Sequence, residues 1–83
     1  MATMNDILFS LEITYEMEFI YKNKHYYLGY NEGPGCFIIE SPDKKIAETY
    51  SKDREEILRL PVFDGKSFIQ IFPEVKMTFY QAQ

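Results

Sequence analysis

Residues 15–41 read YEMEFIYKNKHYYLGYNEGPGCFIIES, and this stretch decides the fold. Large apolar side chains alternate with mostly polar ones along residues 15–21, which is typical of a strand that is buried on one face. Turn-forming residues at 23–24 and 31–35 then separate two further apolar segments. The stretch therefore predicts three antiparallel strands joined as a meander.

The lengths of the two turns predict how these strands pair. A two-residue turn at positions 23–24 places Phe19 opposite Leu28, and a four-residue loop at positions 32–35 places Ile39 beside Leu28. Both pairings put large apolar side chains on one common face, so we expect that face to be buried. Its members are Met17, Phe19, Tyr21, Tyr26, Leu28, Tyr30, Phe37 and Ile39.

The flanking segments leave alternatives open. Residues 5–12 fit one face of a helix, but the strand-like alternation also extends back to Ile7. We favour the helix, because a single strand over residues 7–21 would span about 50 Å, which is well beyond the usual length of a strand. Residues 44–60 fit either one long helix or a strand over 45–50 followed by a helix from Asp53, and we favour the second arrangement.

The whole chain is long enough for one core, so we expect a single domain over residues 1–83. Helical spacing over residues 68–75 and alternation over residues 75–79 add a further helix and a last strand. The expected fold class is α+β. It consists of a small, mostly antiparallel meander sheet of three to five strands, with two or three short helices packed on one face.

Composition argues against several classes of protein. The chain has 13 acidic and 9 basic residues, and a net charge of −4 disfavours nucleic-acid binding, which needs a basic face. The one cysteine, Cys36, cannot form an internal disulfide. Residues 1–13 resemble neither a signal peptide nor a membrane span. We therefore expect a cytoplasmic protein without membrane association.

No arrangement of residues indicates catalysis. The tripeptide GKS at 65–67 resembles the end of a phosphate-binding loop, but Leu60 stands where that loop requires a glycine. Cys36 and His25 would lie at opposite ends of the second hairpin, and one cysteine with one histidine does not make a zinc site. We therefore assign no catalytic, cofactor-binding or metal-binding residue, and we favour a protein that is not an enzyme.

The other face of the sheet is the candidate interaction surface. The predicted registers make Ile20, Tyr27 and Ile38 neighbours there, and contiguous apolar residues with a polar rim mark binding surfaces. The rim consists of Glu16, Glu18 and Glu40. We expect this face to bind a protein partner or a second copy of the chain, unless other parts of the chain cover it.

Basic side chains gather at one end of the predicted sheet. Lys22, Lys24 and His25 lie in the first hairpin turn, and Lys44 and Lys45 lie in a turn at the same end if residues 45–50 form a strand. An anion could bind there. We favour the simpler role of turn lysines, which protect strand edges and keep a protein soluble.

Two segments resemble small uncharacterised bacterial α+β proteins. These proteins pair an EFxYxxKxYxL-type hairpin with an EEIL…DGKS-type helical segment, and here the segments read EMEFIYKNKHYYL at 16–28 and DREEILRLPVFDGKSFIQIF at 53–72. The resemblance covers roughly two fifths of the chain. It implies a compact α+β fold and transfers no activity.

The favoured function is that of a small, non-catalytic binding or protein-interaction module. One alternative is an acidic inhibitor or immunity-type protein of a mobile element, which would block a basic site with its carboxylates. The other is a small-molecule binder or small enzyme with a tyrosine-lined pocket. The carboxylates are Glu16, Glu18, Glu32 and Glu40, and the tyrosines are Tyr26, Tyr30 and Tyr50.

Overall fold

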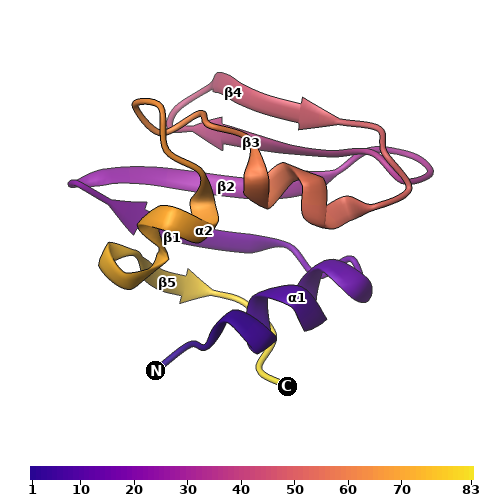
Figure 1. The fold of residues 1–83 in the computed structure, drawn as a ribbon, viewed down its shortest axis with the longest axis horizontal. Helices are drawn as coiled ribbons and strands as arrows, with labels where there is room; N and C mark the ends of the chain where they lie inside the picture. The colour runs from indigo at the N-terminus through magenta and orange to yellow at the C-terminus, as the bar shows by residue number, and fades with distance from the viewer.

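The computed structural model describes residues 1–83 and has the expected α+β fold (Figure 1). Five strands form one antiparallel sheet in the order β4-β3-β2-β1-β5. The elements are α1 (Met4–Glu12), β1 (Met17–Tyr21), β2 (Lys24–Tyr30), β3 (Cys36–Glu40), β4 (Lys44–Thr49), the 3-10 helix η1 (Arg54–Arg59), α2 (Phe68–Ile71), the 3-10 helix η2 (Phe72–Glu74) and β5 (Lys76–Phe79).

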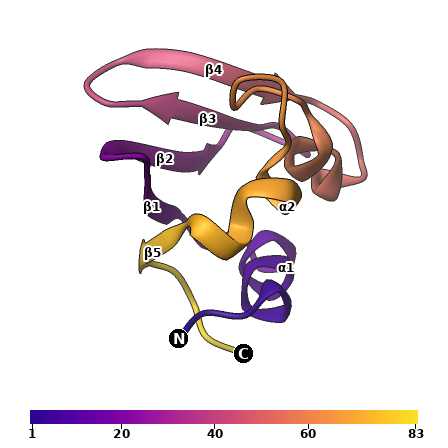
Figure 2. The same ribbon diagram turned by 60° about the vertical axis from the view of Figure 1, so that its left-hand side comes forward.

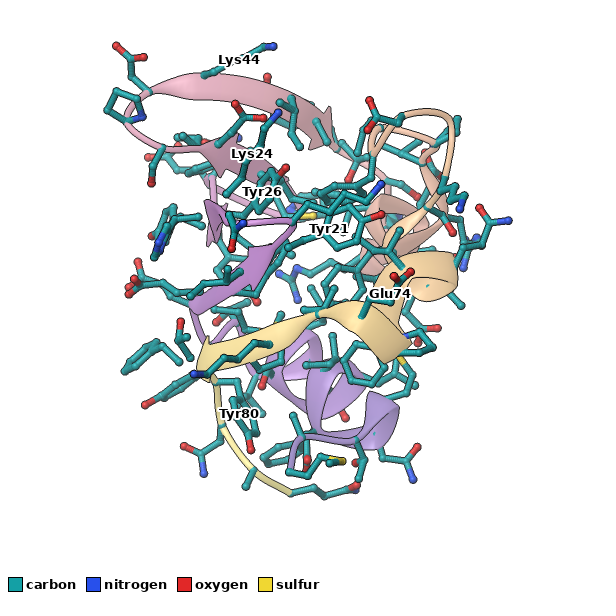
Figure 3. The ribbon with its side chains drawn as sticks, turned by 90° about the vertical axis from the view of Figure 1, so that its left-hand side faces the viewer. Tyr21, Lys24, Tyr26, Lys44, Glu74 and Tyr80 are labelled. Atoms are coloured by element: carbon teal, nitrogen blue, oxygen red, sulfur yellow. The ribbon has the colours of Figure 1, made fainter.

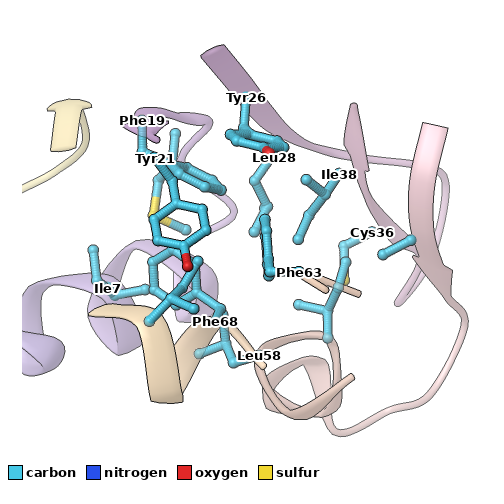
Figure 4. Close-up of a cluster of buried hydrophobic side chains, with 14 of the residues drawn as sticks. Ile7, Phe19, Tyr21, Tyr26, Leu28, Cys36, Ile38, Leu58, Phe63 and Phe68 are labelled. Carbon is cyan, nitrogen blue, oxygen red and sulfur yellow. The ribbon is translucent and has the colours of Figure 1, made fainter. Parts of the chain in front are cut away.

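The helical segments all lie on one side of the sheet, and the other side is left uncovered (Figures 1 and 2). Segment η1 contacts β4, α1 and α2, so it joins the helical layer to the sheet. The core lies between the two layers (Figure 4). Phe19 from β1 and Phe68 from α2 are its largest fully buried side chains, and their rings meet edge to face at 5.1 Å.

The pairing of β1 with β2 differs from the predicted register by two residues. The turn lies at Lys22 and Asn23, whose φ angles of 49° and 63° match the type I′ turn that suits the twist of a hairpin. Phe19 therefore lies opposite Tyr26 rather than Leu28. A shift of two residues keeps each side chain on its own face, so the predicted buried face of these two strands is confirmed.

The pairing of β2 with β3 differs by one residue, and the predicted face of β3 is wrong. The connecting loop has five residues, 31–35, where four were assumed, and Ile38 rather than Ile39 lies opposite Leu28. An odd shift turns a strand over, so every side chain of β3 changes face. Cys36 and Ile38 enter the core (Figure 4), whereas Phe37 and Ile39 lie on the uncovered side because they alternate with these two residues along the strand.

The N-terminal segment forms the helix α1, as favoured, and this helix is hydrogen-bonded to the C-terminal segment of the chain. The Thr3 hydroxyl accepts from the Asp6 amide at 3.2 Å, and the Asp6 carboxylate accepts from the Thr3 amide at 2.8 Å, which forms a capping box. Ser10, which is fully buried, donates its hydroxyl to the Gln81 carbonyl and accepts from the Gln81 amide, both at 3.1 Å. The two termini consequently lie close together (Figure 1).

The segment over residues 44–60 is a strand followed by a helical turn, as favoured. Asp53 caps η1 by accepting from the Glu55 amide at 3.1 Å, and its carboxylate pairs with Arg59 at 2.6 Å. This ion pair lowers the pKa of Asp53, because Arg59 donates a hydrogen bond to the charged carboxylate. Pro61 follows directly after the C-cap residue, Leu60.

The GKS tripeptide has a structural role. Asp64 and Gly65 have φ angles of 53° and 84° and form a tight turn, across which Phe63 pairs with Lys66. The Ser67 hydroxyl then accepts from the Gln70 amide at 3.2 Å and caps α2. These residues therefore form a turn and a helix start, and they form no phosphate-binding loop.

Candidate functional site

The uncovered side of the sheet carries four of the six residues predicted for the interaction surface. Ile38 is 0% exposed inside the core, and Glu40 faces the helical side, so these two assignments are wrong. The one-residue shift of β3 explains the correction, since it replaces Ile38 by its neighbours Phe37 and Ile39. We use the term outer face for the surface formed by Glu16, Glu18, Ile20, Tyr27, Phe37 and Ile39, flanked by Lys45, Glu48 and Lys76.

The centre of the outer face is a pair of aromatic rings that lie over a glycine. The rings of Tyr27 and Phe37 have their centroids 6.0 Å apart, and both cross above Gly29. A Cβ at Gly29 would meet the Tyr27 ring at 2.6 Å and the Phe37 ring at 2.8 Å. The glycine is therefore what lets both rings lie close to the sheet, and the rings in turn cover its backbone.

The Tyr27 hydroxyl is fixed by a carboxylate on the same face. It donates a hydrogen bond to Glu16 at 2.5 Å. Burial of the ring, together with this hydrogen bond, raises the pKa of Tyr27 to about 12. The phenol consequently keeps its proton at neutral pH, and its ring is held in one orientation.

Charges on the outer face are ordered along the strands. Glu16 and Glu18 lie toward the end that holds the 31–35 loop, which we call the loop end. Lys76 pairs with Ile20 toward the end that holds the Lys22-Asn23 turn, which we call the turn end. None of these three charged groups forms an ion pair within the chain, and the face therefore runs from acidic to basic.

The β4 side of the outer face is electrostatically compensated. Lys45 pairs with Glu48 at 3.1 Å and also lies 5.8 Å from the centroid of the Phe37 ring. Glu48 accepts further hydrogen bonds from Tyr50 at 2.9 Å and Asn31 at 2.8 Å. These contacts, the Tyr50 hydrogen bond first, lower the pKa of Glu48. The uncompensated charges thus lie on the β1 and β5 side.

The basic residues gather at the turn end as predicted, but on both sides of the sheet. Tyr26 pairs with Glu40 there, so the turns after β1 and after β3 lie at the same end. On the helical side Lys22, Lys24 and Lys44 line a cleft, whereas His25 and Lys45 lie on the outer side. The cleft also contains Tyr21 and Tyr26 (Figure 3), both of which were expected on the buried face of the sheet.

The two alternative sites predicted from the sequence do not assemble as described. Tyr26 lies at the turn end, the Tyr30 hydroxyl donates to the Tyr15 carbonyl at 2.9 Å near the loop end, and Tyr50 is 63% exposed. The four acidic residues also separate, because Glu40 lies on the helical side, 3.9 Å from a lysine ammonium, and Glu32 lies in the 31–35 loop.

The cysteine is a core residue. Cys36 pairs with Tyr30 at the loop end of β2, whereas His25 is at the turn end, so the two side chains cannot form a catalytic pair. The Cys36 thiol lies 3.4 Å from the Thr49 hydroxyl. Burial raises the pKa of the thiol, which disfavours the reactive thiolate.

Comparison with known proteins gives no relative. No protein-family model, no curated protein and no solved structure shows significant similarity to this chain. Among its helices, none has the length and the apolar character that a membrane span needs.

Proposed function

We propose that this protein is a non-catalytic protein-interaction module, and that the outer face of its sheet is the binding surface. The observation that carries the proposal is a half-buried apolar centre, formed by Ile20, Tyr27, Phe37 and Ile39, on a side of the sheet that no helix covers (Figure 2). Contiguous apolar side chains with a polar rim mark binding surfaces, and a sheet face buries such side chains by packing against another layer.

The order of charges specifies the partner surface. It must present basic groups to Glu16 and Glu18 and an acidic group to Lys76. A second copy of the chain can present these charges if the two copies are related by a two-fold axis that lies in the plane of the interface, perpendicular to the strands. The loop end of one copy then meets the turn end of the other, so the acidic groups of each copy face Lys76 of its partner. We therefore take a second copy as the occupant of the outer face.

The area of the face predicts a weak complex. Five strands spaced by about 4.8 Å, with five residues each, offer roughly 400 Å² per protomer. A standard interface buries about 800 Å² per partner. We thus expect association in the micromolar range or weaker, with the aromatic pair near the centre and the ion pairs at the rim.

Sedimentation velocity from micromolar to millimolar protein concentration tests the proposal. Glu18→Lys and Lys76→Glu should each weaken the dimer by roughly tenfold, since an attractive exposed pair becomes repulsive. The double charge swap should restore association. Glu12→Lys is the matched control, because Glu12 is exposed at the end of α1 on the helical side and the charge change is the same.

Three results would overturn the proposal. The first is a monomer at every concentration, and the second is an equal effect of the control and Glu18→Lys. The third is a double variant that associates no better than the single ones, which would exclude the two-fold arrangement. Capture of a different protein by the outer face, with the wild type monomeric, would replace the second copy by that partner.

A further inference from the structure

A cleft at the turn end has features that the proposed function does not use. It has a volume of about 150 Å³ and lies between the sheet and residues 62–64. Side chains from β1, β2, β3 and β4 and from the turn after β1 line it, so it is bounded by both layers of the molecule (Figure 3). It lies on the helical side of the sheet, opposite to the outer face.

Two tyrosines enter this cleft from the core. Tyr21 and Tyr26 are only 4% and 6% exposed, and their rings pack against Phe63 with centroids at 6.0 and 5.3 Å. The hydroxyls of Tyr27, Tyr30 and Tyr50 donate hydrogen bonds within the chain, whereas those of Tyr21 and Tyr26 do not. Neither hydroxyl oxygen is enclosed without a partner, so both reach solvent and are free to donate to a ligand in the cleft that their side chains line.

The charges around the cleft add further donors. The cleft is lined by three lysines and two carboxylates, namely Lys22, Lys24, Lys44, Glu40 and Asp64. The only ion pair among them is the 3.9 Å contact of Lys24 with Glu40. Lys22 lies 5.5 Å from the centroid of the Tyr21 ring and is held in the type I′ turn. Lys44 and Asp64 form no ion pair within the chain.

The protonation states suit a donor site. Burial, followed by the charges of Glu40 and Asp64, raises the pKa of Tyr26, so its hydroxyl stays protonated at neutral pH. Three ammonium groups and two phenols thus offer hydrogen bonds, whereas the acceptors of the cleft are two carboxylates, one of them already paired. The surplus of donors over acceptors favours an anionic ligand with several oxygen atoms.

We propose that this cleft binds a phosphate group, with Lys24, Lys44 and the hydroxyls of Tyr21 and Tyr26 as its donors. A tetrahedral oxyanion can accept hydrogen bonds on all sides, which matches donors that come from the three strands β1, β2 and β4, whereas a carboxylate has two oxygen atoms on one side. The volume of about 150 Å³ accommodates an ion of this size but excludes a large ligand from the closed part of the site.

Inorganic phosphate is the probe for the test. Amide chemical shifts of the protein are followed by NMR during titration with phosphate, at constant ionic strength with chloride, and acetate is titrated in parallel. The expected result is saturable shifts confined to the turn end. Acetate should bind at least tenfold more weakly.

Matched substitutions distinguish a specific phosphate site from the nonspecific electrostatic attraction of phosphate to surface lysines. Lys44→Met and Tyr26→Phe should each weaken phosphate binding about tenfold. The controls are Lys45→Met, which removes the same charge from the adjacent outer position, and Tyr50→Phe at an exposed ring. Tyr26→Phe keeps the ring in the core, so a lost fold does not explain a lost site.

Shifts that grow without saturation, equal effects of Lys44→Met and Lys45→Met, or an unchanged affinity of Tyr26→Phe would each refute the site. Equal affinity for acetate would refute the assignment to phosphate. Because the cleft and the outer face lie on opposite sides of the sheet, failure of this test leaves the proposed dimer unaffected.

Discussion

Ile38 and Ile39 provide a decisive test of the register of β3. The two residues are adjacent and chemically identical, but Ile38 is 0% exposed opposite Leu28, whereas Ile39 is only partly buried on the outer face. Their truncation to alanine removes the same atoms from two different environments. The comparison therefore isolates which face of β3 is in the core.

The expected difference is large compared with the stability of the domain. Ile38→Ala removes three carbon atoms from a fully enclosed site and should cost about 2–5 kcal/mol. A domain of this length has roughly 4–12 kcal/mol of unfolding free energy in total. A loss of about 3 kcal/mol lowers the Tm by roughly 12–24 °C at this size. Ile39→Ala should cost the monomer less than about 1 kcal/mol.

Guanidinium unfolding followed by circular dichroism measures both variants. The protein concentration should be low micromolar, so that association through the outer face does not add to the measured stability. If Ile39→Ala is the more destabilising of the two, the register described here is wrong, and the pairing of Leu28 with Ile39 expected from a four-residue loop is right. Equal costs would also contradict an ordered β3 with one buried face.

Three further outcomes are expected. Ser10→Ala leaves the amide and carbonyl of Gln81 without a partner, so it should cost about 1–3 kcal/mol and speed hydrogen exchange at the Gln81 amide. The pKa of Tyr27 is raised from 10.0 to about 12, so the protonated Tyr27 hydroxyl contributes its full stabilisation below pH 10 and loses it as the pH rises toward 12. Glu16→Gln removes the charged acceptor of this hydroxyl and should lower the pKa of Tyr27 in an ultraviolet titration. Tyr27→Ala should cost about 1 kcal/mol in the wild type but less alongside Gly29→Ala, because the added methyl group already displaces the ring; an additive double-mutant cycle would contradict the contact.

The hairpin registers show what alternation can and cannot predict. Along residues 15–21, large apolar side chains alternate with mostly polar ones, so the buried face was evident even though the turn was misplaced by one residue. Segment β3 reads CFIIE, with apolar residues on both faces, so its orientation depended on the length of one loop. Gly33 and Gly35 in that loop permit several turn geometries, and local sequence does not choose among them.

Helix positions were better predicted because their signals are local. Asp53 caps η1 and Ser67 caps α2 through side chains within three residues. The hydrogen bonds between Ser10 and Gln81 join residues that are 71 positions apart, and no pattern in the sequence indicates them. The same reason explains why the cleft itself was not predicted, although the lysines alone suggested anion binding at this end. The lysines were expected at one end, but Phe63, against which the two tyrosines pack, comes from a segment that is distant in the sequence.

The central strand β2 carries both proposed sites, and its alternation makes them separable. Tyr26 points into the cleft and Tyr27 lies on the outer face, so neighbouring residues contribute to different sites. Substitutions at one face leave the side chains of the other in place. Tyr26→Phe should therefore reduce phosphate binding without changing sedimentation, and Glu18→Lys should do the reverse. If either variant changes both properties together, the effect comes from a disturbed β2, and neither site can be assigned from that variant.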